Sequence, residues 1–272
     1  MRRNVMAGAF LVAIEVGGML AFSQTEPTEA QGRPAFSLPS RAVQVAPGVF
    51  SLGTAIHNGQ VVEGYAIAEH KGKEHGKPDG GGGGRGGGET CFAFIANGAE
   101  WNTAEPWMID PGNDAGLTVG TVTNLIAGAF HKWETAAGAE IFGNQIVGVV
   151  VGADCVSADD KNEVLFMEIE GTGTIAATIM WGVFCGPPSG RGLTEWDMVY
   201  DDFECDWSAE AGGVSGAMDF DNIAVHEVGH AAGMGHPSDA CTEETLFRMA
   251  SEGETKKRNF FDGDKAGILE IY

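Results

Sequence analysis

Basic residues are scarce in this chain: 16 Lys and Arg stand against 38 Asp and Glu, which gives a net charge of −22. The imbalance is local, because residues 1–88 hold eight basic and seven acidic residues, whereas residues 89–272 hold eight and 31. A segment that acidic repels phosphate backbones, so the sequence excludes nucleic acid as a partner. Bound cations such as calcium and plain solubility explain the acidic surface equally well.

Several familiar motifs are also missing. The glycine run at residues 80–88 is not followed by Gly-Lys-Ser/Thr, so a phosphate-binding loop is excluded and a flexible linker is favoured. No D-x-D-x-D-G loop occurs, so the candidate calcium ligands rest on acidic residues alone. A solvated surface is the favoured interpretation of these acids, which are Asp154, Asp159, Asp160, Asp197, Asp201 and Asp202.

None of the five cysteines belongs to a C-x-x-C pair. In a secreted protein, five cysteines predict up to two disulfides with one thiol left over. Cys185 and Cys205 are expected to flank one hairpin, and this pairing is weakly favoured.

The N-terminus has the pattern of a secretory signal peptide over residues 1–23. Arg2 and Arg3 precede the largely apolar stretch Val5–Phe22, and Ala21-Phe22-Ser23 is a suitable cleavage site. Glu15 argues against a stable membrane span, and no later run is long and apolar enough to cross a bilayer. We therefore expect a secreted, extracellular protein with no membrane segment in its mature form.

The glycine-rich stretch divides the remaining chain. Residues 24–70 are predicted to be a propeptide-like N-terminal region, with a hairpin at 42–68 that turns at Asn58-Gly59. Residues 71–89 are the predicted linker, and residues 90–272 have the size of one catalytic domain. Both charge and composition change at the linker, which indicates that 24–70 stands apart from the catalytic core.

The most informative motif is H-E-x-x-H-x-x-G-x-x-H, from His226 to His236. Histidines four apart on a helix lie on one face, so His226 and His230 can reach one zinc ion. Gly233 can end the helix and turn the chain, which brings His236 round as a third ligand. Three protein ligands leave one position open, as in catalytic zinc sites, and Glu227 can deprotonate a zinc-bound water.

Hydrophobic spacing predicts further elements in the 90–272 region. Thr121–Ala137 has the period of an amphipathic helix, the motif helix is expected from about Asp219 to Ala232, and a last helix begins at Asp264. The predicted strands are Cys91–Ile95, Ile146–Val151, Val164–Ile169, Thr174–Met180 and Trp196–Tyr200.

The motif and this order of elements resemble the metzincin zinc peptidases, and the ending Ser251–Arg258 is similar to matrixin-like members of bacterial and archaeal type. The resemblance implies an α+β fold with a twisted mixed sheet, long helices and a zinc-motif active-site helix. It implies zinc ligation by His226, His230 and His236, with Glu227 as general base.

The family also places a methionine turn under the zinc. Here either Met249 supplies it or Leu246 replaces it, and the register of the sequence favours Leu246. No propeptide cysteine motif precedes the linker, and a disulfide is the favoured role of Cys91. Asp79, His57, His70 or His75 could cover the metal instead, and the sequence does not select one.

The favoured function is that of a secreted zinc endopeptidase acting on protein or peptide substrates. A non-catalytic zinc-binding adhesion or scaffold module is the alternative, although the presence of Glu227 argues for catalysis. A zinc hydrolase of a non-peptide bond is a third possibility, because chemistry belongs to the site rather than to the fold.

Overall fold

The computed structural model describes residues 35–72, 90–171 and 173–272. The chain divides into two units, residues 1–32 and 33–272, and every described residue belongs to the second unit. The expected signal peptide at 1–23 and nearly all of the expected linker at 71–89 thus lie outside the described residues.

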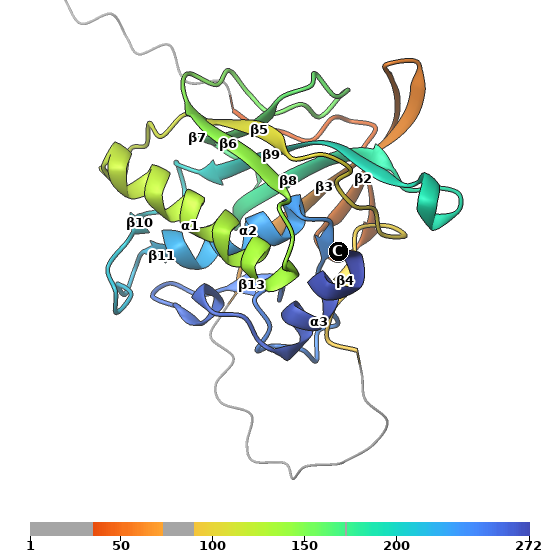
Figure 1. The fold of residues 1–272 in the computed structure, drawn as a ribbon. Helices are drawn as coiled ribbons and strands as arrows, with labels where there is room; N and C mark the ends of the chain where they lie inside the picture. Colours follow the sequence, from red (N-terminus) through yellow and green to blue (C-terminus); the bar gives the residue numbers. More distant parts are fainter. Residues whose placement is uncertain (1–34, 73–89, 172) are drawn as a thin grey trace, which may run out of the picture. The chain divides into compact units, whose positions relative to one another are not determined.

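A mixed sheet lies at the centre of the fold (Figure 1), with the strand order β1-β2-β3-β8-β9-β7-β5-β6 and with β13 paired to β3. Strands β6, β5, β7 and β9 pair in parallel, whereas β9-β8, β8-β3, β3-β2 and β2-β1 are antiparallel. The strands are β1 (Val43–Ala46), β2 (Val49–His57), β3 (Gln60–Lys71), β5 (Glu105–Ile109), β6 (Phe142–Val147), β7 (Asn162–Met167), β8 (Thr174–Val183), β9 (Gly192–Asp201) and β13 (Met249–Ala250).

The predicted N-terminal hairpin is present as β2 and β3. Its turn has φ angles of 48° at Asn58 and 79° at Gly59. Positive φ at both central residues is the geometry that joins two twisted strands most directly, and Asn-Gly adopts it at little cost.

The position of this hairpin differs from the sequence-based expectation. Strand β3 pairs antiparallel with β8 from Glu63 opposite Gly182 to His70 opposite Thr174. The propeptide-like role of residues 24–70 stays a prediction, but the hairpin is continuous with the sheet formed by residues 90–272 in this structure. The physical reason is that β8 would otherwise be an unpaired edge strand, which β3 satisfies.

Three α-helices are described, and α1 and α2 lie side by side on one face of the sheet (Figure 1). Helix α1 (Val119–Ala137) begins where the Thr118 hydroxyl accepts the Thr121 N–H and ends at Gly138, whose φ is 66°. Its predicted apolar stripe is buried, and the Trp133 indole donates to the Val225 carbonyl of α2 at 2.7 Å.

Helix α2 (Phe220–Ala231) carries the histidine motif, and α3 (Asp262–Ile271) closes the chain, as the sequence predicted. In the three described stretches, no helix combines the length and apolar character needed to cross a membrane. The shorter elements are β4 (Ala93–Phe94), η1 (Pro188–Gly190), β10 (Trp207–Ser208), β11 (Met218–Asp219), β12 (Met234–Gly235) and η2 (Lys256–Arg258).

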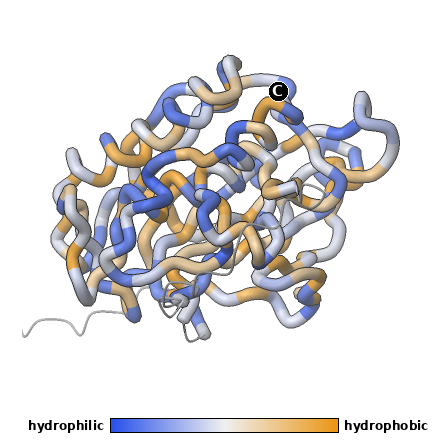
Figure 2. The backbone as a smooth tube through the Cα atoms, turned by 90° about the horizontal axis from the view of Figure 1, so that it is seen from below, coloured by the Kyte–Doolittle hydropathy of each residue, from blue (hydrophilic) through white to orange (hydrophobic). Residues whose placement is uncertain are grey.

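A second buried cluster covers the opposite face of the sheet, where Phe36, Val150 and Cys155 pack on side chains of β2, β3, β7 and β8. Figure 2 shows apolar and polar segments alternating along the whole tube rather than forming one long apolar run. One strand prediction is corrected here: Ile146–Val151 is not a strand throughout, because β6 ends at Val147, opposite the last residue of β5, and Val149 and Val151 are exposed.

Candidate active site

Helix α2 places the first two histidines one turn apart. The helix begins at Asp219, whose carboxylate accepts the Asn222 N–H at 2.8 Å and is also paired with Arg258. After α2 the chain turns at Gly233, where φ is 97° and an added Cβ would lie 2.7 Å from the Ala99 carbonyl oxygen. Glycine is therefore required there both by conformation and by space, and the turn leads through β12 to His236.

The three imidazoles converge on one point. Their Nε2 atoms are separated by 3.0 Å for His226 and His230, 3.1 Å for His230 and His236, and 3.3 Å for His226 and His236. Four ligands at tetrahedral angles and zinc–nitrogen distances of roughly 2.0–2.1 Å would be about 3.3 Å apart. The donor set thus fits a zinc ion with no rearrangement beyond a few tenths of an ångström.

The other ring nitrogens orient two of these ligands. His226 Nδ1 donates to the Thr245 carbonyl at 2.7 Å, and His230 Nδ1 donates to the Met234 carbonyl at 2.9 Å. Such bonds fix the tautomer with Nε2 unprotonated, which is the form that binds metal. Burial lowers the pKa of His230 to about 4, and burial followed by the nearby Lys257 charge lowers the pKa of His226 well below its usual value. Both rings are therefore neutral near pH 7.

Glu227 is buried beside the triad. The Thr178 hydroxyl of β8 donates to its Oε2 at 2.5 Å, while Oε1 has no hydrogen-bond partner among the described residues. Burial, and next the carboxylate of Glu69, raise the pKa of Glu227 well above its usual value. One oxygen is thus anchored, and the other is available to exchange a proton with a bound molecule.

Leu246, and not Met249, lies beneath the zinc-motif helix. Leu246 is buried, and a Cβ added at Gly229 would be 2.7 Å from its Cδ2 atom. Met249 instead lies in β13 opposite His70. The Asp264 carboxylate accepts the backbone N–H groups of Thr245 and Leu246 at 2.9 and 3.3 Å, so it fixes the turn whose carbonyl orients His226.

The N-terminal hairpin covers the histidines. The turn between β1 and β2 lies against the third ligand, since a Cβ on Gly48 would be 3.4 Å from His236 Cε1. Ala68 of β3 donates its N–H to the Gly48 carbonyl at 2.8 Å, which holds the turn in place. A cavity of about 510 Å³ remains between this hairpin and β4 and reaches His236.

Two charged side chains at the site were not predicted. Glu69 of β3 and Lys257 of η2 are both fully buried, and the Lys257 ammonium donates to Glu69 Oε1 and to the Phe247 carbonyl. Glu69 interrupts an apolar strand, and Lys257 belongs to a run of three basic residues in an acidic domain; both were signals in the sequence. Of the residues proposed to cover the metal, His57 instead contacts Asp160 and His70 contacts Thr174, while His75 and Asp79 lie outside the described residues.

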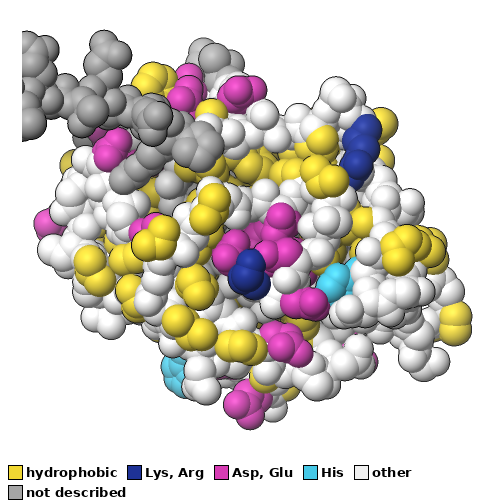
Figure 3. Space-filling view, turned by 90° about the horizontal axis from the view of Figure 1, so that it is seen from above, with side chains coloured by type: hydrophobic (Ala, Val, Ile, Leu, Met, Phe, Trp, Pro, Cys, Tyr) yellow, Lys and Arg dark blue, Asp and Glu magenta, His cyan; other side chains and the backbone are white. Residues whose placement is uncertain are grey.

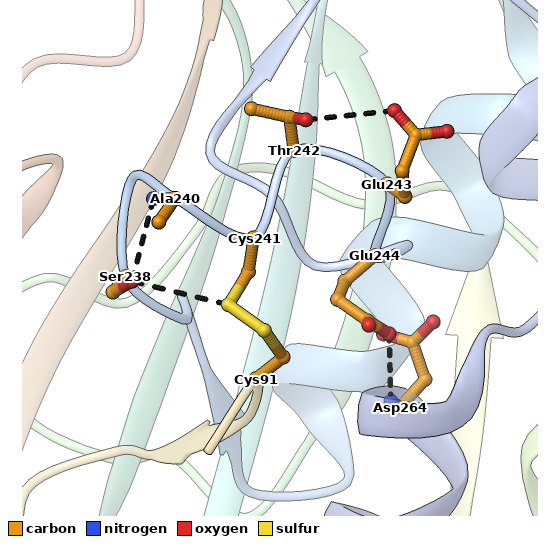
Figure 4. The surroundings of a disulfide bond; sticks show 8 residues. All are labelled: Cys91, Ser238, Ala240, Cys241, Thr242, Glu243, Glu244 and Asp264. Carbon is orange, nitrogen blue, oxygen red and sulfur yellow. Dashed lines mark hydrogen bonds between the residues drawn. A yellow bond between two sulfur atoms is a disulfide. The ribbon is translucent and has the colours of Figure 1, made fainter. Parts of the chain in front are cut away.

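A disulfide joins Cys91 to Cys241 and links the start of the catalytic region to the loop before Thr245 (Figure 4). Next to it, the Glu244 carboxylate accepts the Asp264 N–H at 3.1 Å. The disulfide role expected for Cys91 is confirmed, but the favoured pair Cys185–Cys205 is wrong. Cys185 follows the end of β8 and Cys205 follows the end of β9, and these antiparallel strands carry the two thiols to opposite ends.

Acidic side chains also gather away from the histidines, and Figure 3 shows such a group around a basic side chain on the view from above. Carboxylate oxygens of Asp154, Glu195 and Asp197 lie within 4.8 Å of one another. Glu195 and Asp197 are buried, and Glu195 Oε1 and Asp197 Oδ1 have no hydrogen-bond partner in the described part of the chain. Burial raises the pKa of Glu195 to about 8 and that of Asp197 well above its usual value.

Two imidazoles and a buried glutamate on α2, with a third imidazole after the turn at Gly233, converge behind a mixed sheet and define the zinc metallopeptidase class. The family model described as Matrixin matches residues 100–272, so the chain belongs to the matrixin family. The comparison with curated proteins found no match. The family confirms the expected α+β metzincin-like fold and, in general terms, a zinc-dependent hydrolase that acts on proteins or peptides.

Proposed function

We propose that this protein is a secreted zinc endopeptidase in which Glu227 is the general base. The observation that carries the proposal is the convergence of the His226, His230 and His236 Nε2 atoms next to Glu227. One oxygen of this glutamate has no hydrogen-bond partner among the described residues. The retained glutamate argues against the alternative of a non-catalytic zinc-binding module.

In the proposed peptide hydrolysis, the zinc ion and the side chains of the protein have different roles. When bound, zinc supplies Lewis acidity to the scissile carbonyl. Glu227 Oε1 accepts a proton from the attacking water and delivers it to the leaving amine. The Thr178 hydroxyl holds Oε2, so the carboxylate stays turned in one orientation while Oε1 carries the proton.

Secretion is supported by the signal-like residues 1–23, by the Cys91–Cys241 disulfide and by the family. Disulfides persist mainly in oxidising compartments, because cytosolic thiols are kept reduced. Secretion is tested by expressing the full chain in a secreting host. The mature protein should appear in the medium with a new N-terminus near residue 24.

We also propose that residues 24–70 restrain the enzyme, since the hairpin within this region covers the histidines. Calcium is proposed as a second ion, held by Asp154, Glu195 and Asp197, because this cation prefers oxygen ligands such as carboxylates. Glu195 Oε1 and Asp197 Oδ1 are buried and have no hydrogen-bond partner among the described residues.

The direct test of the proposed function is hydrolysis of denatured casein by zinc-loaded full-length protein. We expect internal cleavage that stops when a zinc chelator is added and returns when zinc is restored. A protein that binds one zinc per chain but cleaves neither casein nor a peptide library would contradict the endopeptidase proposal.

A further inference from the structure

Lys257 is a fully buried cation next to the zinc site. Its ammonium donates to Glu69 Oε1 and to the Phe247 carbonyl, and it lies 3.2 Å from His226 Nδ1. A buried ammonium is costly unless it is paired and hydrogen-bonded, so this position requires an anionic partner. The neighbouring Arg258 does not compete for that partner, because it is paired with Asp219.

The anionic partner of Lys257 is Glu69, which lies in the extended strand β3. At its end, β3 lies between two strands: His70 is opposite Thr174 of antiparallel β8 and opposite Met249 of parallel β13. Extended peptides bind sheet edges in this way, with main-chain hydrogen bonds for affinity and alternate side chains in pockets for specificity. Strand β3 therefore occupies its place as a bound peptide would, and Glu69 is the side chain of this strand that contacts Lys257.

The buried carboxylate of Glu69 lies next to the proposed reacting groups. Side-chain atoms of Glu69, His226 and Glu227 lie within 4.8 Å of one another, and Glu69 Oε1 is 3.7 Å from His226 Nδ1. A peptide that replaced β3 with an acidic residue at this point would pass its backbone beside Glu227. The cation that would bind this acidic side chain is Lys257.

We propose that Lys257 is a specificity-determining residue, and that the enzyme prefers extended substrates with Glu or Asp next to the cleaved bond. Glu69 holds this place in the present structure. The inference rests on the proposed peptidase function and names its substrate class. It is unexpected for a region, residues 89–272, with 31 acidic and eight basic residues, because its overall charge disfavours acidic peptides.

The test uses two peptidyl hydroxamates that are identical except for a Glu or a Gln side chain next to the zinc-binding group. Their affinities for the zinc-loaded full-length protein are measured by calorimetry. We expect the Glu probe to bind about tenfold or more tightly than the Gln probe, since hydrogen bonds to charged groups discriminate on this scale. Lys257→Gln should abolish the preference, whereas Lys265→Gln, at an exposed position on α3, should retain it.

A Glu69→Gln variant keeps the test decisive if Lys257→Gln fails to fold. Removing the competing carboxylate should strengthen binding of the Glu probe relative to the parent. Equal affinity of the Glu and Gln probes for the parent protein would overturn the proposal. The proposal would also be overturned if neither probe bound either the zinc-loaded parent or the zinc-loaded Glu69→Gln variant.

Cleavage sites in casein separate this proposal from the function on which it rests. Cuts next to apolar residues alone would contradict the acidic preference and leave the peptidase function standing. If the Glu probe bound selectively and this binding depended on Lys257, but no protein was cleaved, the acidic preference would stand and the peptidase function would be contradicted.

Discussion

The two oxygens of Glu227 have different surroundings, and this asymmetry separates metal binding from catalysis at the residue scale. Oε2 is fixed by Thr178 of β8, while Oε1 has no partner in the described part of the chain. The histidine nitrogens, by contrast, are oriented by the carbonyls of Thr245 and Met234. Because the two sets of contacts are independent, the base can be removed without disturbing the ligands.

Glu227→Ala is therefore expected to keep one zinc per chain and to lose peptidase activity by about 10²- to 10⁴-fold, the usual contribution of a general base. Elemental analysis and a casein assay measure the two quantities on the same sample. His230→Ala is the matched control and should lose stoichiometric zinc as well as activity. If Glu227→Ala cleaves within tenfold of the parent, another group is the base.

The ligand set could be predicted because its information is local. The helical repeat and one glycine are sufficient to bring His226, His230 and His236 together. Lys257 and Glu69 are 188 residues apart, and no periodicity connects them. Their pairing depends on which strand lies beside β8, which is a property of the whole sheet and not of either segment.

At the scale of elements, the hairpin of β2 and β3 occupies the edge of β8 with which an extended substrate would pair. It pairs with β8 and its preceding turn contacts His236, so it either remains in the working enzyme or has to leave before a substrate binds. The proposed restraint requires that it leaves.

A disulfide across the two strands distinguishes these cases. Ala68 and Ala177 are directly opposite, and facing Cβ atoms in antiparallel pairs are about 4.5–5.5 Å apart, so Ala68→Cys with Ala177→Cys should form a bond. We expect the oxidised double variant to be at least about tenfold less active than its reduced form, because the lock holds β3 against β8. The assay is peptide hydrolysis before and after reductant.

The parent protein treated with the same reductant is the necessary control, since Cys91–Cys241 is also reduced. The two single-cysteine variants control for the substitutions themselves. Equal activity of the locked and reduced forms would show that the hairpin is a permanent part of the enzyme.

The sequence predicted the existence of most elements but not their partners. Alternating and helical patterns identified the hairpin, α1, α2 and most strands, because side-chain periodicity is determined within each segment. The attachment of β3 to β8 and the Cys91–Cys241 bond, which spans 150 residues, depend on how distant segments meet. Spacing along the chain carries no such information.

At the scale of the whole molecule, the many acidic residues include one close cluster, formed by Asp154, Glu195 and Asp197. The pKa of Glu195 is raised to about 8, mainly by burial, so the folded protein holds this proton more tightly than the unfolded chain does. The corresponding stabilisation is complete below about pH 4.5 and is lost as the pH rises through about 8.

We therefore expect the melting temperature of zinc-loaded, calcium-free protein to fall between about pH 5 and pH 8.5. Added calcium should raise it by about 3 °C or more at pH 8, and by less at pH 5, because the ion binds the deprotonated carboxylates. Differential scanning calorimetry at both pH values measures the effect.

Asp197→Asn should remove most of the response to calcium, while Glu270→Gln, at an exposed position on α3, should not. A response to calcium that is the same at both pH values, or unchanged in Asp197→Asn, would exclude this cluster as the binding site.

The place of β3 inside the sheet also has a consequence for how the chain reaches its native state. During synthesis the hairpin emerges early, whereas its partner β8 follows on the order of a hundred residues later, and such distant pairings form slowly. Until then the hydrogen-bonding edge of β3 is open to other strands, including the same strand of a neighbouring nascent chain. Glu63 and Glu69 along that strand would oppose such pairing through charge repulsion. These carboxylates would thus disfavour association of newly made chains before β8 has been synthesised.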